Sequence, residues 1–312
     1  MKRILMIIVL VIISVLGFTT AQSAFAQVVD RTGVPRGIGS SDGDYLRDPD
    51  TRLDPLEYWT PQRMEEAIAA TEGDRPTATS RESNDRPTRA PSVVTAPPSV
   101  GRLFFTNTNG EDRVCTASVV DSATENIIIT AAHCVYTRLT GWNSNIVFVP
   151  AYNNGQRPYG SWRSLGKVAS TGFTQQNNNK YDQAFVKVEN VNGATIQDTV
   201  GSNSMAYDAG FIHTGVTFLG YPSQYNGVSN GIARYCIANT VRRYATSDDA
   251  QLGCALGGGA SGGPWYTTVN ATTGTIFAVN SRGSADGEDV QYAAPLHQGV
   301  QSLLAQIEGS FL

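Results

Sequence analysis

Residues 127–134 read Ile-Ile-Ile-Thr-Ala-Ala-His-Cys, an apolar run that ends in a histidine and a cysteine. Three β-branched residues in succession, followed by threonine and two alanines, are typical of a buried strand that stops just before His133. The end of a strand holds a side chain in a fixed place, so His133 is the first candidate for chemistry in this chain. The other two histidines, His213 and His297, have no comparable neighbours.

Short apolar or β-branched runs recur on both sides of this stretch, and Gly, Asn, Pro and Ser separate them. Examples are residues 103–106, 114–120, 146–149, 184–188, 216–220, 265–269, 275–279 and 290–293. Their lengths and the turn residues between them predict an all-β domain. The tail differs, because its apolar residues recur at the spacing of one helix face: Leu296, Val300, Leu303, Leu304 and Ile307. This spacing predicts a C-terminal helix.

Residues 257–265 read Gly-Gly-Gly-Ala-Ser-Gly-Gly-Pro-Trp and form a second candidate cluster. A serine hydroxyl is a weak nucleophile until a base takes its proton. Flanking glycines let the backbone turn its N–H groups toward one point, where a tetrahedral oxyanion could be held. A flexible glycine turn is the plainer interpretation, but Pro264 and Trp265 directly after it favour a fixed loop. A third cluster starts at Asp182, just before the apolar run 184–188, where a carboxylate could orient a histidine.

The order His133, Asp182, Ser261, with the local motifs at 130–134 and 259–264, resembles the chymotrypsin-like (trypsin-fold) serine proteases. Within that family it is similar to the bacterial glutamyl-endopeptidase-like branch. The resemblance covers about residues 100–310 and implies two packed six-stranded antiparallel β-barrels, closed by a C-terminal helix. It also implies a serine endopeptidase that attacks with Ser261, moves the proton through His133 and orients the imidazole with Asp182.

Further roles follow from the same resemblance. The backbone N–H groups of Gly259 and Ser261 would form the oxyanion hole. The strand Ser281-Arg282-Gly283 would pair with the substrate backbone, with Arg282 in place of the family's usual aromatic residue. Proteins and peptides are the implied substrates, no cofactor or metal is implied, and the chain is expected to act as a monomer.

The sequence departs from its apparent relatives in the loop and pocket around Ser261. Position 260 is alanine, where the digestive proteases carry an aspartate that binds the newly freed N-terminus. Residues 254–258 contain no acid, so a preference for Lys or Arg is not implied. Residues 279–281 lack the histidine with which glutamyl endopeptidases bind a substrate carboxylate, so a preference for Glu is not implied either.

The four cysteines all follow residue 114: Cys115, Cys134, Cys236 and Cys254. Three pairings are arithmetically possible, and an exported chain permits disulfides. We expect the local pairs, 115–134 and 236–254, each of which would close a loop worth roughly 3 kcal/mol in the chain-entropy model. A metal site, the alternative, needs ligands more closely spaced in the sequence.

Residues 1–26 predict a secretory signal peptide, and hence a secreted protein with no stable membrane anchor after processing. Lys2 and Arg3 precede the apolar run 4–18, and Ala24-Phe25-Ala26 supplies a small-x-small cleavage site. A membrane anchor is the alternative, but the run is shorter than the roughly 20 residues that a spanning helix needs.

Residues 27–98 are predicted to be a largely irregular pro-region that inhibits the protease domain, 99–312, until it is cut away; the alternative is a linker that contains one apolar helix. They carry 13 acidic and 9 basic side chains in 72 residues, whereas 99–312 carry 14 and 12 in 214. Such a charged, proline-rich segment buries too little apolar surface to order itself throughout. One piece is an exception, because Thr60-Pro61 starts a helix whose apolar face would dock on the body: Met64, Ala67 and Ile68. Possible processing points are Arg81, Arg86 and Arg89.

Three other functions compete with that of a protease. Nucleic-acid binding is disfavoured because the net charge is -4. An α/β-hydrolase would use the G-x-S-x-G elbow at 259–263, with Asp286 or Asp289 and then His297 as its partners. The short gaps between these residues leave little room for the helices and strands that this fold needs. The remaining alternative is a catalytically silent, protease-like scaffold for binding or adhesion, although such scaffolds usually lack a member of the triad.

Overall fold

The structure is a computed structural model that describes residues 28–29, 35–36, 43–47, 54–71, 91–225, 228–229, 231–284 and 289–310. It divides into two units, residues 1–38 and 39–312. In the first unit, β1 (Val28–Val29) pairs antiparallel with β2 (Pro35–Arg36). The predicted signal peptide, residues 1–26, and Arg81, Arg86 and Arg89 lie outside the described residues. No helix in the described ranges is long and apolar enough to cross a membrane.

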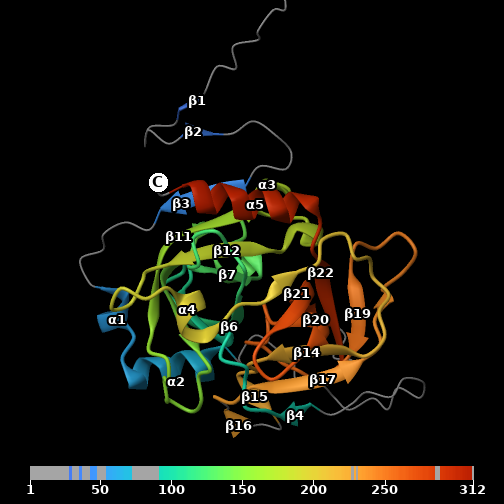
Figure 1. The fold of residues 1–312 in the computed structure, drawn as a ribbon, viewed down its shortest axis with the longest axis horizontal. Helices are drawn as coiled ribbons and strands as arrows, with labels where there is room; N and C mark the ends of the chain where they lie inside the picture. The colour runs from blue at the N-terminus through green and yellow to red at the C-terminus, as the bar shows by residue number, and fades with distance from the viewer. Residues whose placement is uncertain are drawn as a thin grey trace, which may run out of the picture. The chain divides into compact units, whose positions relative to one another are not determined.

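Six strands of the second unit close into an antiparallel barrel in the order β10-β5-β6-β7-β12-β11, because β10 also pairs with β11 (Figure 1). The strands are β5 (Val100–Thr106), β6 (Asp112–Val119), β7 (Ile127–Thr130), β10 (Ser144–Pro150), β11 (Trp162–Ser170) and β12 (Ala184–Val188). Hairpin β8 (Tyr136–Thr137)–β9 (Gly141–Trp142) projects from this barrel after β7. Two short helices also belong to this half, α3 (Thr171–Thr174) and α4 (Ile196–Val200).

Both faces of the strands in this barrel are buried, which explains why the run at 127–130 is apolar without alternation. Ile128 packs into the apolar cluster inside the barrel. Ile127 and Ile129 point to the opposite face and join a second cluster, which also holds residues of the other half and of the helices. A strand that is buried on both faces has a nearly continuous apolar sequence.

The second sheet runs in the order β18-β19-β22-β21-β20-β14-β17-β4, with β13 paired in parallel to β21. Its strands are β4 (Ser92–Val93), β13 (Ser204–Met205), β14 (Val216–Gly220), β17 (Arg234–Ala238), β18 (Val241–Arg242), β19 (Ala250–Gly253), β20 (Pro264–Val269), β21 (Gly274–Gly283) and β22 (Val290–Pro295). A separate small hairpin is formed by β15 (Gln224–Tyr225) and β16 (Val228–Ser229). The all-β class predicted from the sequence is confirmed, and one half of the body is a closed six-stranded antiparallel barrel.

Both predicted disulfides are present, Cys115–Cys134 and Cys236–Cys254. The first joins β6 to the turn that follows β7. The second joins β17 to the residue after β19, and no ladder links these two strands in the part of the chain that the structure describes. The second disulfide therefore connects strands that the backbone hydrogen bonds leave apart.

The predicted helix at residue 60 is confirmed as α2 (Pro61–Ala70), preceded by the single turn α1 (Pro55–Tyr58). The Thr60 side chain accepts a hydrogen bond from the Arg63 N–H, and Pro61 occupies the first helical position, so the start of the helix is capped as expected. The predicted apolar face is buried against β6: Met64, Ala67 and Ile68. Trp59, just before the helix, is 1% exposed and packs on Phe104 with ring centroids 5.4 Å apart.

A second piece of the predicted pro-region, β3 (Gly43–Arg47), pairs antiparallel with the C-terminal half of β11. It is an additional strand on the barrel, beside the predicted C-terminal helix α5 (Gln298–Gly309), drawn in red in Figure 1. The apolar face of α5 is buried as the spacing predicted: Val300, Leu303 and Ile307. Parts of residues 27–98 are therefore integrated into the packing of the body.

Candidate active site

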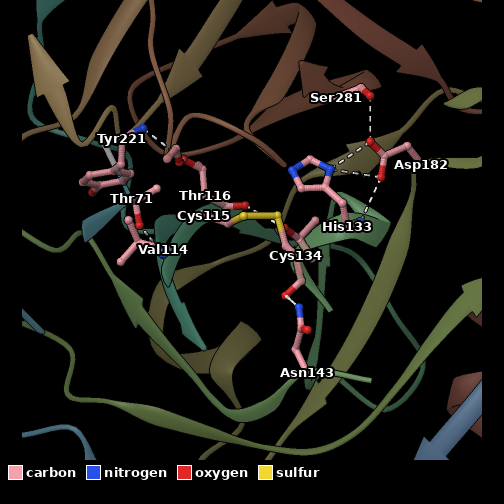
Figure 2. The surroundings of a disulfide bond; sticks show 12 residues. Thr71, Val114, Cys115, Thr116, His133, Cys134, Asn143, Asp182, Tyr221 and Ser281 are labelled. Atoms are coloured by element: carbon pink, nitrogen blue, oxygen red, sulfur yellow. Dashed lines mark hydrogen bonds and ion pairs between the residues drawn. A yellow bond between two sulfur atoms is a disulfide. The ribbon is translucent and has the colours of Figure 1, made fainter. Parts of the chain in front are cut away.

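The turn after β7 places His133 beside Asp182. Residues 132–134 form one turn of 3₁₀-helix, which the Cys115–Cys134 disulfide ties to β6 (Figure 2). The backbone N–H of His133 donates to Asp182 Oδ1 at 2.9 Å. Its ring Nδ1 lies 2.9 Å from Oδ2 and 3.2 Å from Oδ1 of the same carboxylate. Two attachments from one residue to one carboxylate fix both the position and the ring orientation of His133.

Asp182 lies between the 3₁₀ turn 179–181 and β12, and it is 2% exposed. Burial by itself raises the pKa of this carboxyl. The charge and hydrogen bonds of His133 and the hydrogen bond from Ser281 outweigh burial and hold the pKa of Asp182 below its ordinary value. The carboxylate is therefore ionised at neutral pH, although it is buried.

The Ser281 hydroxyl donates to Asp182 Oδ2 at 2.6 Å (Figure 2). Ser281 is the extra residue of a β-bulge, because β21 pairs with β22 at Asn280 and again at Arg282 with a shift between them. A bulge changes the direction in which neighbouring side chains point. Here Ser281 reaches the buried carboxylate, and the next residue, Arg282, lines the cavity in front of it.

Ser261 opens onto a cavity of about 550 Å³, which His133, Asp182, Ser281 and Arg282 also line. The three residues of the predicted triad are thus gathered at one cavity, as the sequence led us to expect. No hydrogen bond joins the Ser261 hydroxyl to His133 among the described residues. Contacts between a nucleophile and its base are often long in an unliganded enzyme.

The loop that carries Ser261 depends on two glycines with positive φ. Gly259 has φ +86° and Gly262 has φ +78°, a backbone region that favours glycine. A Cβ at Gly259 would lie 2.7 Å from the Tyr221 carbonyl oxygen, and one at Gly262 would lie 2.3 Å from that of Thr116. Within the described residues, the N–H groups of Gly259 and Ser261 have no intramolecular acceptor. Both N–H groups therefore remain available to a bound ligand.

Thr116, which the sequence analysis did not single out, holds this loop from the first barrel. Its N–H donates to the Ser261 carbonyl at 2.8 Å, and its hydroxyl donates to the Gly259 carbonyl at 2.9 Å. The same hydroxyl accepts the Tyr221 N–H at 2.9 Å. A polar residue in the middle of the apolar run 114–120 was the available signal, since a buried hydroxyl needs a partner.

The end of helix α2 reaches the same cavity. Thr71 lines it, and the Thr71 hydroxyl accepts the backbone N–H of Val114 at 3.0 Å (Figure 2). On the other side, a methyl group at Gly258 would lie 3.0 Å from the Thr71 carbonyl oxygen. A residue of the predicted pro-region therefore lies between β6 and the serine loop.

The other two histidines lie outside this cavity. His213 packs on Phe277, with ring centroids 4.3 Å apart. His297 caps α5, because its Nδ1 accepts the Gly299 N–H at 3.1 Å. This capping role explains His297 as a structural residue, which removes the support for the α/β-hydrolase arrangement. Asp286, one of the acids in that arrangement, lies outside the described residues.

One group of potential metal ligands lies close together in the described part of the chain: Cys115, His133 and Cys134. Both sulfur atoms are consumed in the disulfide, so neither can supply the thiolate that a metal would need. This donor set does not fit a metal site.

The chain is similar to known proteins. Among curated proteins, the chain is 26% identical over 175 residues to the extracellular metalloprotease of Bacillus subtilis (strain 168), a match over 55% of this chain. The chain spans about half the length of that relative, 51%.

Solved structures of proteases resemble the body of the chain. Protease Anisep from Arthrobacter nicotinovorans is 28% identical with a TM-score of 0.63, covering 68% of this chain and 96% of its own. The thermostable serine protease AL20 from an extremophilic microorganism is 27% identical with a TM-score of 0.62, covering 68% and 97%. A Glu endopeptidase shares the fold at 18% identity and a TM-score of 0.56, covering 70% and 96%.

The residues that match a protein family include most of those that line the cavity. Residues 92–301, from β4 into α5, match the Trypsin family. This match contains His133, Asp182 and Ser261 and covers more than half of the chain. The chain belongs to the trypsin family of serine proteases.

Proposed function

We propose that the chain is a secreted serine endopeptidase that hydrolyses peptide bonds through an acyl-enzyme intermediate. The observation that carries the proposal is the double attachment of His133 to Asp182, through backbone and ring, in the cavity that Ser261 lines. An imidazole held at Nδ1 by a buried carboxylate has its Nε2 left for a proton from a hydroxyl.

In the proposed reaction, Ser261 Oγ attacks the scissile carbonyl carbon while His133 Nε2 takes the hydroxyl proton. The carbonyl oxygen becomes an oxyanion, which the N–H groups of Gly259 and Ser261 bind. His133 then donates its proton to the leaving amine, and the acyl-enzyme forms. A water molecule then attacks the acyl carbonyl carbon while His133 takes its proton; the bond to Ser261 Oγ breaks, His133 returns the proton to Oγ, and the acyl group leaves as a carboxylic acid. Asp182 stabilises the imidazolium throughout.

The substrate backbone is proposed to lie along Ser281, Arg282 and Gly283. β20 pairs with β21 only as far as Val279, while β22 pairs with Arg282 and Gly283 on the other side. This end of β21 therefore has one open edge at the cavity, where an extended peptide can add as a strand.

The test of catalysis is the serine itself. Ser261→Ala should abolish peptide hydrolysis, a loss on the order of 10⁶ in kcat for a triad nucleophile. A fluorophosphonate should label Ser261 in the wild-type chain from which residues 27–98 have been removed and leave the same chain carrying Ser261→Ala unlabelled. Full hydrolysis by Ser261→Ala, or failure of the wild type to react, would contradict the proposal; the second outcome would favour a silent binding scaffold.

We further propose that residues 27–98 act as an intramolecular inhibitor and that their removal activates the enzyme. The Thr71 hydroxyl accepts a hydrogen bond from the Val114 N–H, and the Thr71 carbonyl lies close to Gly258. A substrate that runs between β6 and the serine loop must therefore displace Thr71. The inhibitor role predicts that undocking α2 exposes the site.

A pair of substitutions in α2 tests this role in the full-length chain. Ile68→Asp puts a charge on the buried face and should raise the rate of phosphonate labelling at Ser261. Ala69→Asp, one residue further on the exposed face, is the matched control and should not change it. An unchanged labelling rate in a folded Ile68→Asp chain, judged by near-UV circular dichroism, would contradict inhibition.

Activation should not require a defined new N-terminus. Ala260 is buried and carries no charge, and the loop is held instead by its glycines and by Thr116. Chains that begin anywhere from residue 90 to residue 99 should have similar kcat. Activity confined to one starting residue would contradict this prediction.

A further inference from the structure

The cavity in front of His133 is lined by three arginines with different partners. Arg113 lies 3.1 Å from the carboxylate of Glu111, and Arg282 lies 2.6 Å from that of Asp249. The third, Arg138, has no carboxylate partner among the described residues; its guanidinium donates to the Asn179 side-chain oxygen. The guanidinium of Arg138 therefore lies at the cavity with no carboxylate in direct contact among the described residues.

Arg138 is held in place, although it lacks an ion pair. Its Cζ lies 4.6 Å from the centroid of the buried Phe173 ring, in a cation–π arrangement, while Asn179 accepts from one of its nitrogens. A guanidinium fixed by stacking and one hydrogen bond keeps other N–H groups free and loses little entropy when it binds an anion.

Arg282 adds a second positive charge that Asp249 only partly neutralises. The same Asp249 oxygen also lies 3.4 Å from Arg243, so one carboxylate serves two guanidinium groups. Partial burial lowers the pKa of Arg138; the negative charge of Asp182 raises it, and the positive charge of Arg282 lowers it again. Arg138 and Arg282 also line the same cavity, so both charges face a ligand bound there.

Arg282 Nη1 donates to the Ser281 hydroxyl at 3.3 Å, and Arg138 donates to Asn179, three residues before Asp182. Both guanidinium groups therefore lie near Asp182, whereas the attacked carbonyl must lie at Ser261. A substrate residue near Arg138 and Arg282 is therefore a neighbour of the residue whose carbonyl is attacked. Because the open edge at 281–283 would hold the acyl part of the substrate, this neighbour precedes the scissile bond.

We propose that Arg138 and Arg282 form a subsite for an acidic side chain at the second, third or fourth residue before the scissile bond. This subsite rests on the proposed endopeptidase function and names its substrate class. A guanidinium pair recognises a carboxylate by charge and by paired hydrogen bonds, and a neutral amide of the same shape lacks the charge.

The test compares peptides that carry Glu or Gln at each of these three positions in turn. We expect kcat/KM to favour Glu at one of them by about two- to fivefold at low salt, the range of exposed charge pairs. The preference should shrink at 1 M salt, where the screening length falls to about 3 Å. Similar rates for Glu and Gln at all three positions would overturn the proposal.

Arginine variants identify the residues responsible. Arg138→Gln should bring the Glu/Gln ratio close to one, and Arg282→Gln should lower it. Arg138→Lys keeps the charge but not the paired N–H groups and should therefore keep only part of the ratio. Arg157→Gln is the matched control, because it removes the same charge from an exposed residue that does not line the cavity. A ratio that survives in both Arg138→Gln and Arg282→Gln would also overturn the proposal. Phosphonate labelling of Ser261 in each variant separates this outcome from a failure of the endopeptidase function, which would abolish labelling in the wild type.

Discussion

The Ser281 hydroxyl and the His133 ring bind the same oxygen of Asp182, Oδ2, at 2.6 and 2.9 Å. Asp182 and His133 belong to the first barrel, whereas Ser281 comes from β21 of the second sheet. The carboxylate is therefore positioned by both halves of the molecule. Its hydrogen bonds therefore depend on the correct packing of the two halves against each other.

We expect Ser281→Ala to lower kcat roughly tenfold while KM changes less. A hydrogen bond to a charged group contributes about 1.5–3 kcal/mol, and its loss leaves the carboxylate less well oriented toward His133. Steady-state kinetics on one peptide measures both constants. Ser202→Ala is the matched control, because it removes a serine hydroxyl from the exposed Asp121. An unchanged kcat in Ser281→Ala would contradict the positioning role.

Thr116→Val should loosen the serine loop. Valine has a similar shape but no hydroxyl, so the Gly259 carbonyl and the Tyr221 N–H both lose a partner, at about 1–3 kcal/mol for each buried group. We expect a lower melting temperature and a lower kcat. Thr116→Ser keeps the hydroxyl and should retain most of both. Equal kcat in the valine and serine variants would argue against this role.

The lowered pKa of Asp182 predicts how its contribution to stability changes with pH. The ordinary value for an unfolded aspartate is about 3.9, and the folded value lies below it. The ionised carboxylate therefore stabilises the fold fully above the unfolded pKa, and this contribution is lost as the pH falls through the folded pKa. Urea unfolding in a Ser261→Ala background should show a larger cost of Asp182→Asn at neutral pH than near pH 2. The same cost at both pH values would contradict the assignment.

Trp59→Ala should destabilise the chain by about 3–5 kcal/mol, the usual cost of removing a large aromatic side chain from a core. Trp59 also donates from Nε1 to the Asn145 carbonyl at 2.5 Å, so the substitution leaves that oxygen without its donor. Urea unfolding of the Ser261→Ala chain measures the change. Leu56→Ala, at an exposed position nearby, should cost far less. A cost below 1 kcal/mol for Trp59→Ala would mean that residues 54–71 are only loosely attached.

Features set by neighbouring residues were predictable from the sequence. The apolar run at 127–130 predicted a strand, the Thr60-Pro61 pair predicted the start of α2, and the spacing after Leu296 predicted α5. Each depends on a periodicity or a cap within a few residues, which tertiary contacts then reinforce.

Features that join distant residues were not predictable in this way. Thr116 reaches Gly259 across 143 positions, and Ser281 reaches Asp182 across 99. β3 carries no recognisable pattern, because its sequence, Gly-Asp-Tyr-Leu-Arg, joins β11 through backbone hydrogen bonds that most residues can make. The uncompensated charge of Arg138 likewise depends on which acids the fold brings near it.

Gly43 and Gln306 exchange two hydrogen bonds across 263 positions of the chain, one from each residue. Pairing of β3 requires β11, and the contact of Gly43 with Gln306 requires docked α5, so we expect this strand to join late in folding. It should also leave early, because β11 keeps its pairing with β10 and β12 when β3 detaches. Hydrogen exchange at residues 43–47 should therefore be faster than in the rest of the barrel. Residues 43–47 precede the barrel strands in the sequence, yet we expect them to join the barrel after those strands have paired.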